Sequence, residues 1–201
     1  MAIRRIGRGK RPARRREILE AALACFEEQG YEVSSIEEIR LRAGASVGSI
    51  YHHFGSKAGI ASALYAEGLG DFQQGLLDEM RRARSARSLV HRVVRFHLGW
   101  AAANPRWAEY LLRMRRVEAV AAIELRLREM NAAFLEQALG LIGPYMDRAE
   151  IVRLSPEVLV SLLFGPAQEF LRLWLDGRAQ LEIRQAQELI AEAAWKSVRP
   201  S

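Results

Sequence analysis

The chain reads SIEEIRLRAGASVGSIYHHFGSK from Ser35 to Lys57, and this stretch decides the fold of the N-terminal region. Ser35 is followed three residues later by Glu38, which is the pattern of a capping box, so a helix is predicted to begin directly after Ser35. Gly44 ends that helix after about two turns. Ser46 can cap a second short helix. Its apolar residues recur at helical spacing at Val47, Ile50, Tyr51 and Phe54.

Longer helices are predicted on both sides of this pair. From Pro12 to Glu28 the apolar residues fall on one helical face, with proline suited to the first turn and Gly30 to the end. Gly55 and Ser56 mark the start of a following helix at Lys57. Two short helices joined by a tight turn behind a longer helix indicate a helix-turn-helix that binds DNA. Helical hairpins also occur in other proteins, so the spacing alone leaves that alternative open.

Positive charge is concentrated at the N-terminus. Eight of the 30 lysines and arginines lie in the first 16 residues, which hold no acid, while the rest of the chain is slightly acidic. Such an arm indicates a polyanionic partner, and nucleic acid fits better than a membrane. A solubilising tail is the alternative. Arg14, Arg15 and Arg16 are also predicted in the first helical turn, where the helix dipole disfavours cations and a bound phosphate would offset that cost.

A family resemblance rests on Gly30-Tyr31, on SIEEI at 35–39 and on RAGASVGSIYHHFGSK at 42–57. Over about residues 12–60 the chain resembles the N-terminal module of TetR/AcrR-family transcriptional regulators, and the run from Gly48 to Phe54 followed by Ser56-Lys57 is its most specific part. The resemblance implies an all-α homodimer with a DNA-reading head and a variable ligand-sensing body. Arg40 departs from the family, which usually has alanine there, and its charged end must reach solvent or phosphate.

The recognition helix is expected to place its N-terminal residues against base edges in the major groove. Ser46 and Ser49 can hydrogen-bond to bases, Val47 can contact a thymine methyl group, and Gly48 permits close approach. Periodicity alone would also allow Val47 in the core. Because no arginine–guanine or asparagine–adenine pair is available, DNA shape and the arm should contribute to recognition.

Phosphate contacts complete the predicted DNA site. The resemblance places Tyr51, His52 and Lys57 at phosphates, with the Tyr51 ring packed and its hydroxyl outward. Ser35 offers a hydroxyl and a helix N-terminus to another phosphate. The candidate DNA-binding residues are therefore Arg14, Arg15, Ser35, Ser46, Val47, Gly48, Ser49, Tyr51, His52 and Lys57.

The whole chain is predicted to be all-α, with about nine helices. A basic flexible arm covers 1–11, the helix-turn-helix module covers 12–57, and a larger ligand-sensing and dimerisation domain covers 58–201. Turn signals, among them Gly143-Pro144, divide the last domain. Its helices are predicted at 57–82, 86–103, 105–114, 117–142, 156–176 and 181–198.

The segment Pro156–Leu175 is apolar almost all round, so one side should enter the core and another should meet a partner subunit. Gly165-Pro166 should kink it. The last helix carries small residues that would let another helix approach. They include Ala186, Ala193 and Ala194, alongside Ile183, Leu189 and Ile190. In the resembled family the last two long helices of each subunit form a four-helix dimer interface.

A small-molecule pocket is the least determined feature of the sequence. Aromatic and sulfur side chains gather in the body, with a few polar residues, Asn131 among them, that could orient a ligand. Ordinary core packing is the alternative for each. The candidate ligand-binding residues are Phe96, His97, Trp100, Trp107, Tyr110, Met114, Phe134, Phe164 and Gln168.

No enzyme is expected, because the sequence holds no nucleophile–base pair, phosphate-cradling glycine loop or metal-ligand spacing. No cofactor is predicted, and neither His52 with His53 nor His91 with His97 is spaced to share a metal. The single cysteine suits a reducing cytoplasm, and charges interrupt each long apolar run, so no membrane span is expected.

The sequence therefore predicts a cytoplasmic transcriptional regulator, most simply a homodimeric repressor that binds a near-palindromic double-stranded operator. A small-molecule effector bound in the C-terminal domain would release it. The alternative is a DNA-binding regulator that senses no small molecule and is controlled by a protein partner or by its expression level. No residue encodes the operator, the effector or the sign of regulation.

Overall fold

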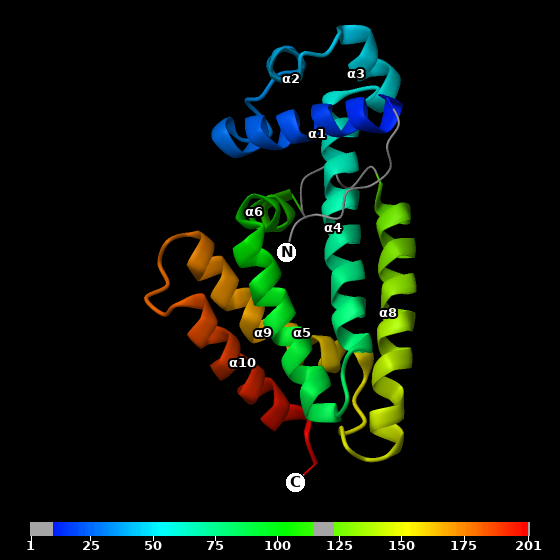
Figure 1. The fold of residues 1–201 in the computed structure, drawn as a ribbon, viewed down its shortest axis with the longest axis vertical. Helices are drawn as coiled ribbons and strands as arrows, with labels where there is room; N and C mark the ends of the chain where they lie inside the picture. The colour runs from blue at the N-terminus through cyan, green and yellow to red at the C-terminus, as the bar shows by residue number, and fades with distance from the viewer. Residues whose placement is uncertain (1–9, 115–122, 201) are drawn as a thin grey trace. The chain divides into compact units, whose positions relative to one another are not determined.

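The computed structural model describes residues 10–114 and 123–200, which are all-helical, with nine helices and no strand in these ranges (Figure 1). Most of the predicted arm, 1–9, and the predicted helix start at 117 lie outside the described residues. The helices are α1 (Lys10–Gln29), α2 (Ile36–Ala43), α3 (Val47–Phe54), α4 (Lys57–Arg81), α5 (Ala86–Ala103), α6 (Pro105–Met114), α8 (Glu124–Asp147), α9 (Pro156–Leu175) and α10 (Ile183–Val198).

Two predicted helix boundaries are wrong. Helix α8 runs through Gly143-Pro144 to Asp147, because a proline in the last turn removes only its own N–H bond. The helix end is closed by the turn that follows, in which the Tyr145 carbonyl accepts the backbone N–H of Glu150 at 2.9 Å. Helix α1 begins at Lys10, so Arg14 to Arg16 lie in its second turn and the dipole argument for a phosphate beside them does not hold.

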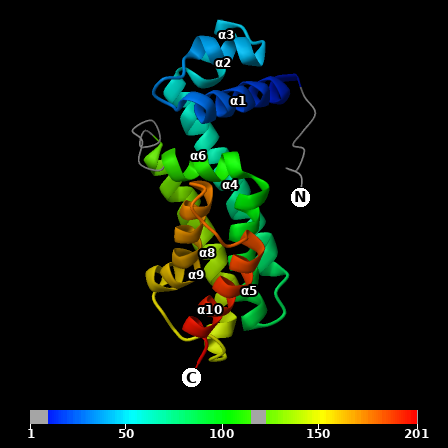
Figure 2. The same ribbon diagram turned by 90° about the vertical axis from the view of Figure 1, so that its left-hand side faces the viewer.

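The chain divides into two compact units, and the N-terminal unit comprises residues 1–69 and 106–127. It therefore extends beyond the predicted 12–57 module. Its core is built from one face of each helix, and both views show α2 and α3 on the same side of α1 (Figures 1 and 2). The fully buried large side chains of this core are Ile18, Ile39, Ile50, Ile60 and Leu64.

Local capping sets the geometry of the helix-turn-helix. The predicted capping box is present: Ser35 Oγ accepts the N–H of Glu38, and the Glu38 carboxylate accepts the N–H of Ser35 at 2.7 Å. Gly44 ends α2 in the left-handed conformation, with φ of 56°, which a residue without a Cβ adopts at little cost. Ser46 caps α3 by accepting the N–H of Ser49 at 3.1 Å. The capping box therefore fixes the start of α2, and Gly44 and Ser46 fix the turn between α2 and α3.

The second unit comprises residues 70–105 and 128–201. Helices α5, α9 and α10 pack against one another in it (Figure 1). Helix α5 contributes a continuous buried face that includes Val90, Val94 and Leu98. The predicted small residues Ala186 and Ala194 of α10 are buried in this chain, so part of the small-residue face serves the unit's own core.

Helix α9 is a single helix through Pro166 and is unusually apolar. An 18-residue window within it has a mean hydropathy of 1.3 and at most two charged residues, so it is long and apolar enough to cross a membrane. Glu169 and Arg172 interrupt the apolar run of α9, as expected, but two charges are too few to fail this criterion. The criterion is weak evidence of a membrane span, because a core or interface helix of a soluble protein also meets it. Only 22% of the window is buried in the described structure.

Replacement of a helical glycine by alanine should destabilise the protein at Gly59 and stabilise it at Gly140. A Cβ at Gly59 would collide with the backbone carbonyl oxygen of Phe54, whereas one at Gly140 meets nothing within 4 Å. We expect G59A to lower the free energy of unfolding by about 1–3 kcal/mol through overpacking. We expect G140A to raise it by about 0.5–1 kcal/mol through helix propensity. Urea unfolding of both variants followed by circular dichroism tests this, and a gain for G59A would contradict it.

Candidate functional site

The N-terminal turn of α3 is exposed on one side and anchored on the other. Ile50 is fully buried, whereas the Val47 side chain is 48% exposed, so Val47 is not a core residue of the chain. Ser46 and Gly48 are exposed, and Ser49 is half-buried. A side chain added at Gly48 would meet nothing within 4 Å, which leaves this turn open to a close approach. The four predicted base-reading residues thus share one accessible turn.

The later turns of α3 carry aromatic side chains near that surface. Tyr51 is 52% exposed, so its ring is less packed than predicted. His52 is exposed and its ring meets His53 edge-on, with centroids 5.3 Å apart. Because Gly55 ends the helix here with φ of 71°, these side chains lie in its last turn. Imidazole and phenol groups in this position can donate hydrogen bonds to phosphate oxygens.

Arg14 of α1 holds the turn between α2 and α3. Its guanidinium donates to the carbonyl oxygens of Gly44 at 2.6 Å and Ala43 at 3.2 Å, and it also pairs with Glu17 at 2.8 Å. These carbonyls belong to the C-terminal end of α2, where cations are favourable. The structure therefore gives Arg14 a positioning role that the sequence analysis missed, because its partners lie about 30 residues away along the chain.

Arg15 and Ser35 also have partners inside the unit. Arg15 forms an ion pair with Glu67 of α4, and its guanidinium carbon lies 5.5 Å from the Phe54 ring centroid. The Ser35 hydroxyl is engaged with Glu38 in the capping box. Arg40, the departure from the family pattern, binds Glu37 through two nitrogens at 2.5 and 2.8 Å. Its charge is thus matched on α2 itself.

The ammonium group of Lys57 points into the unit. Its Nζ donates to the carbonyl oxygens of Tyr31 at 2.9 Å, Glu32 at 3.0 Å and Ser34 at 2.9 Å. It also lies 4.7 Å from the Tyr31 ring centroid. A lysine has three N–H donors, so these bonds use all of them. The predicted phosphate contact of Lys57 is therefore replaced, in this conformation, by a bond between the start of α4 and the loop after α1.

The second unit contains an aromatic cluster around one buried histidine. The His97 ring packs edge-on against Phe72 at 5.4 Å and Phe164 at 5.3 Å, and Trp100 meets Phe72 at 5.3 Å. Within the described residues, neither ring nitrogen of His97 has a well-formed hydrogen bond. Burial lowers the pKa of His97 to about 4, although the Gln168 side chain favours the protonated form. His97 is therefore a neutral polar group in an apolar surrounding at pH 7.

This cluster unites His97, Trp100, Phe164 and Gln168 from the predicted ligand set and adds Phe72. Sequence analysis missed Phe72 because a single phenylalanine on α4 gave no separate signal. Trp100 Nε1 is anchored to Asp71 at 3.1 Å, and Asn131 accepts from the buried Gln73 at 2.8 Å. Phe134 is half-buried on α8.

Three other predicted ligand residues belong to the core of the N-terminal unit. Tyr110 donates to the Ala61 carbonyl at 2.9 Å and stacks on Phe26, and burial raises its pKa. Met114 is buried in the same core, and Trp107 packs against it. Helix α6 thus turns its aromatic side chains into this core, and the candidate ligand set is divided between the two units.

Comparison with known proteins places this geometry in a family. Residues 18–64 match the family model of bacterial regulatory proteins of the tetR family, and they cover the α1–α4 core and the exposed turn of α3. Residues 18–64 carry the N-terminal module of the TetR family. TetR-family proteins are regulators rather than enzymes. Among the described residues, no group of three or more His, Cys, Asp or Glu side chains could hold a metal ion.

Three relatives define the extent of the similarity. The fatty acid metabolism regulator protein of Bacillus subtilis is 24% identical over 163 residues, covering 79% of this chain and 82% of that protein. The transcriptional repressor AcnR of Corynebacterium glutamicum is 34% identical over 90 residues, 38% of this chain, and the match spans only 48% of AcnR. The structure of FadR from Bacillus subtilis with stearoyl-CoA has a TM-score of 0.76 at 21% identity, covering 92% and 99% of the two chains. The last comparison shows that the chain shares the fold of that structure.

A variant of Lys57 distinguishes two possible roles of its side chain, which are to hold the start of α4 against the loop after α1 or to contact a DNA phosphate. We expect K57M to lower the free energy of unfolding by about 1.5–3 kcal/mol, because three carbonyls lose a charged donor. Chemical unfolding measures this in the absence of DNA. A phosphate contact alone would instead leave stability unchanged and reduce the salt dependence of DNA binding by about one counterion.

Replacing His97 should remove a pH dependence of stability. The folded protein holds the His97 pKa at about 4, against 6.5 for an ordinary histidine. Below pH 6.5 the unfolded chain therefore takes up a proton that the folded chain refuses, so stability falls between pH 6.5 and 4. That loss is about 3 kcal/mol in the wild type. We expect urea unfolding of H97L to show a flatter profile over this range, and parallel profiles would contradict the assignment.

Proposed function

We propose that this TetR-family chain is a cytoplasmic, dimeric transcriptional repressor that binds a near-palindromic operator through α3 and leaves it when a small molecule binds the second unit. The exposed N-terminal turn of α3 carries the proposal. That turn presents two hydroxyl-bearing residues, an apolar side chain and a glycine, and α3 is anchored by the fully buried Ile50. A helix presented in this way can enter the major groove with its first residues at base edges.

Arg14, Arg15 and Lys57 support this reading indirectly. Each binds a group within the N-terminal unit, at the α2–α3 turn, at Glu67 and at the loop after α1. They hold the helices on which α3 sits, while Tyr51 and His52 remain available for phosphates. We therefore assign base reading to Ser46, Val47, Gly48 and Ser49, and phosphate contact to Tyr51, His52 and the helix N-terminus at Ser35.

Dimerisation is supported by apolar side chains that the single chain leaves exposed on α9 and α10. Val158 is 45% exposed, Val160 is 42% exposed and Leu189 is 63% exposed. A partner that covers these residues would remove apolar area from water, which favours association. A twofold dimer carries two copies of α3, so its operator should be near-palindromic.

The aromatic cluster around His97 is our candidate effector site. Burial of a neutral histidine without a well-formed hydrogen bond leaves a polar anchor that a ligand could satisfy. FadR, a structural neighbour, has been solved with stearoyl-CoA, so a fold of this kind accommodates a small molecule. Release requires only that the effector bind the non-DNA conformation better, with a coupling of about 1–3 kcal/mol.

Fluorescence anisotropy with labelled DNA from around the protein's own gene tests the function. The titration is run at two salt concentrations with unrelated competitor DNA. We expect saturable binding that survives the competitor, with two chains per operator. Binding that disappears equally on any sequence as salt rises would show phosphate neutralisation without a specific operator.

Replacing the apolar side chain of Val47 on α3 by a charged one should weaken operator binding. In V47E a carboxylate replaces an apolar group at the groove surface, where it repels phosphates and cannot contact a thymine methyl group. We expect operator affinity to fall at least about tenfold, since one lost base contact is worth about 1–3 kcal/mol. The control is L125E, which changes a 72% exposed side chain on α8 of the same unit. Equal loss in both variants, or normal binding by V47E, would contradict the proposed role of α3.

A further inference from the structure

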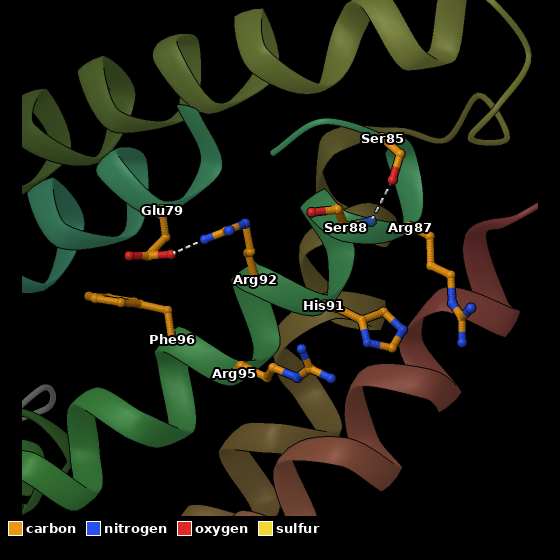
Figure 3. A pocket seen from close by; sticks show the side chains of 8 residues that line it. All are labelled: Glu79, Ser85, Arg87, Ser88, His91, Arg92, Arg95 and Phe96. Atoms are coloured by element: carbon orange, nitrogen blue, oxygen red, sulfur yellow. Dashed lines mark hydrogen bonds and ion pairs between the residues drawn. The ribbon is translucent and has the colours of Figure 1, made fainter. Parts of the chain in front are cut away.

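The second unit contains an open hollow beside the His97 cluster, since Phe96 in its lining has its ring centroid 5.7 Å from that of Phe72. Its volume is about 680 Å³, and it lies on α5 with one wall from α4 (Figure 3). Small-molecule sites have volumes of about 300–1,000 Å³, so the hollow has the size of a ligand site. Its lining residues are Glu79, Ser85, Arg87, Ser88, His91, Arg92, Arg95 and Phe96.

Three guanidinium groups dominate the charge of this lining. Arg87, His91 and Arg95 follow one another at intervals of four on α5, so they form one stripe with a rise of about 6 Å between neighbours. Arg92 comes from the next stripe and points toward Glu79, with its Nη1 2.5 Å from the carboxylate (Figure 3). Glu79 is the one acid in the lining. The hollow therefore presents three cations against one carboxylate.

These guanidinium groups retain donors for a ligand. Arg87 contacts Glu192 of α10 at 2.9 Å through Nη2, and Arg95 contacts Glu188 of α10 through Nη2. A guanidinium has five N–H donors, so a contact through one nitrogen leaves the others available. In addition, the buried Nε of Arg92 has no partner among the described residues. Because guanidinium groups match phosphate oxygens in a planar fork, phosphate is the anion that suits this arrangement.

The behaviour of His91 supports a positive field in the hollow. Burial lowers the pKa of His91, and the charges of Arg95 and Arg87 lower it further. Glu192, whose Oε2 lies 3.3 Å from His91 Nε2, acts in the opposite direction but does not reverse the shift. The carboxylate of Glu192 on α10 therefore offsets the positive charge of Arg87 and Arg95 at His91 only in part.

The two ends of the hollow differ in polarity. At one end Ser85 caps α5 by accepting the N–H of Ser88 at 3.2 Å, so a helix N-terminus and two hydroxyl-bearing residues stand beside Arg87. At the other end the Phe96 ring is apolar (Figure 3). This ring lies directly over Gly75 of α4, where an added Cβ would come within 2.5 Å of it. A ligand with a charged part and an apolar part matches both ends.

We propose that this hollow binds a small molecule that carries a diphosphate ester, with its phosphates on Arg87, Arg92 and Arg95 and its organic part against Phe96. Arg87 and Arg95 are separated by about 12 Å of rise along α5, and Arg92 lies between them along the helix. Two linked phosphates offer more acceptor oxygens to these three long side chains than one carboxylate does. The proposal goes beyond the repressor function and does not depend on it, because binding to the second unit is measurable without DNA.

Isothermal titration of the full-length chain with ADP, inorganic pyrophosphate and adenosine tests the site. ADP should bind, pyrophosphate should bind more weakly, and adenosine should not bind. The double variant R87Q/R95Q should weaken ADP binding at least tenfold. R153Q is the matched control, because Arg153 also pairs with one carboxylate, Asp147, and is 74% exposed. It should bind ADP as the wild type does.

A second variant and an NMR titration distinguish loss of the binding site from a folding defect. S88D places a carboxylate in the first turn of α5, where the helix dipole favours it, so the helix should persist while ADP binding is lost. In NMR titrations of the wild type, pyrophosphate should raise the pKa of His91, because an anion stabilises the imidazolium form.

Several outcomes would overturn the proposal. They are no binding of ADP, equal weakening by R153Q, and an unchanged His91 titration. Pyrophosphate binding as tight as ADP would remove the role of Phe96 and leave an inorganic phosphate site. Displacement of ADP by duplex DNA of unrelated sequence would show that the arginines form a general surface for phosphate backbones.

Discussion

The burial of Ile50 is the constraint on which the N-terminal unit depends. Ile50 is fully buried together with Ile18 and Ile39, so α1, α2 and α3 share one core. Burying a side chain of this size stabilises a protein by about 1.5–3 kcal/mol. A helix of eight residues such as α3 would not persist alone in water, so its orientation follows from this contact. With Ile50 pointing inward, Val47 and Gly48 in the first turn of α3 remain exposed.

Side-chain hydrogen bonds to backbone carbonyls then restrain the connections on either side of α3, which core packing alone leaves adjustable. Arg14 reaches the carbonyls at the end of α2, and Lys57 reaches those of the loop after α1. Each joins segments distant in sequence, so together they restrain α3 from both neighbouring connections. The lysine that the family resemblance places at a phosphate is thus, in this chain, part of the support of the helix.

The sequence predicted local features well because their causes are local. The capping box at Ser35, the glycine turns and the helix order follow from residues within four positions of one another. It did not predict the partners of Arg14 and Lys57, since nothing in the sequence says which distant carbonyls a long side chain will meet. It grouped Tyr110 and His97 in one candidate ligand set for the same reason, although the two residues lie in different cores in space. Pro144 does not end α8, because a proline in the last turn of a helix removes only one backbone hydrogen bond.

The exposed apolar face of α9 has a consequence for dosage in the cell. If two chains must associate through it before both reading helices can bind, operator occupancy at low expression varies with the square of chain concentration. A small change in synthesis or degradation would then produce a larger change in transcription. A promoter under such control would respond more steeply to chain concentration than one bound by a monomer at a single site.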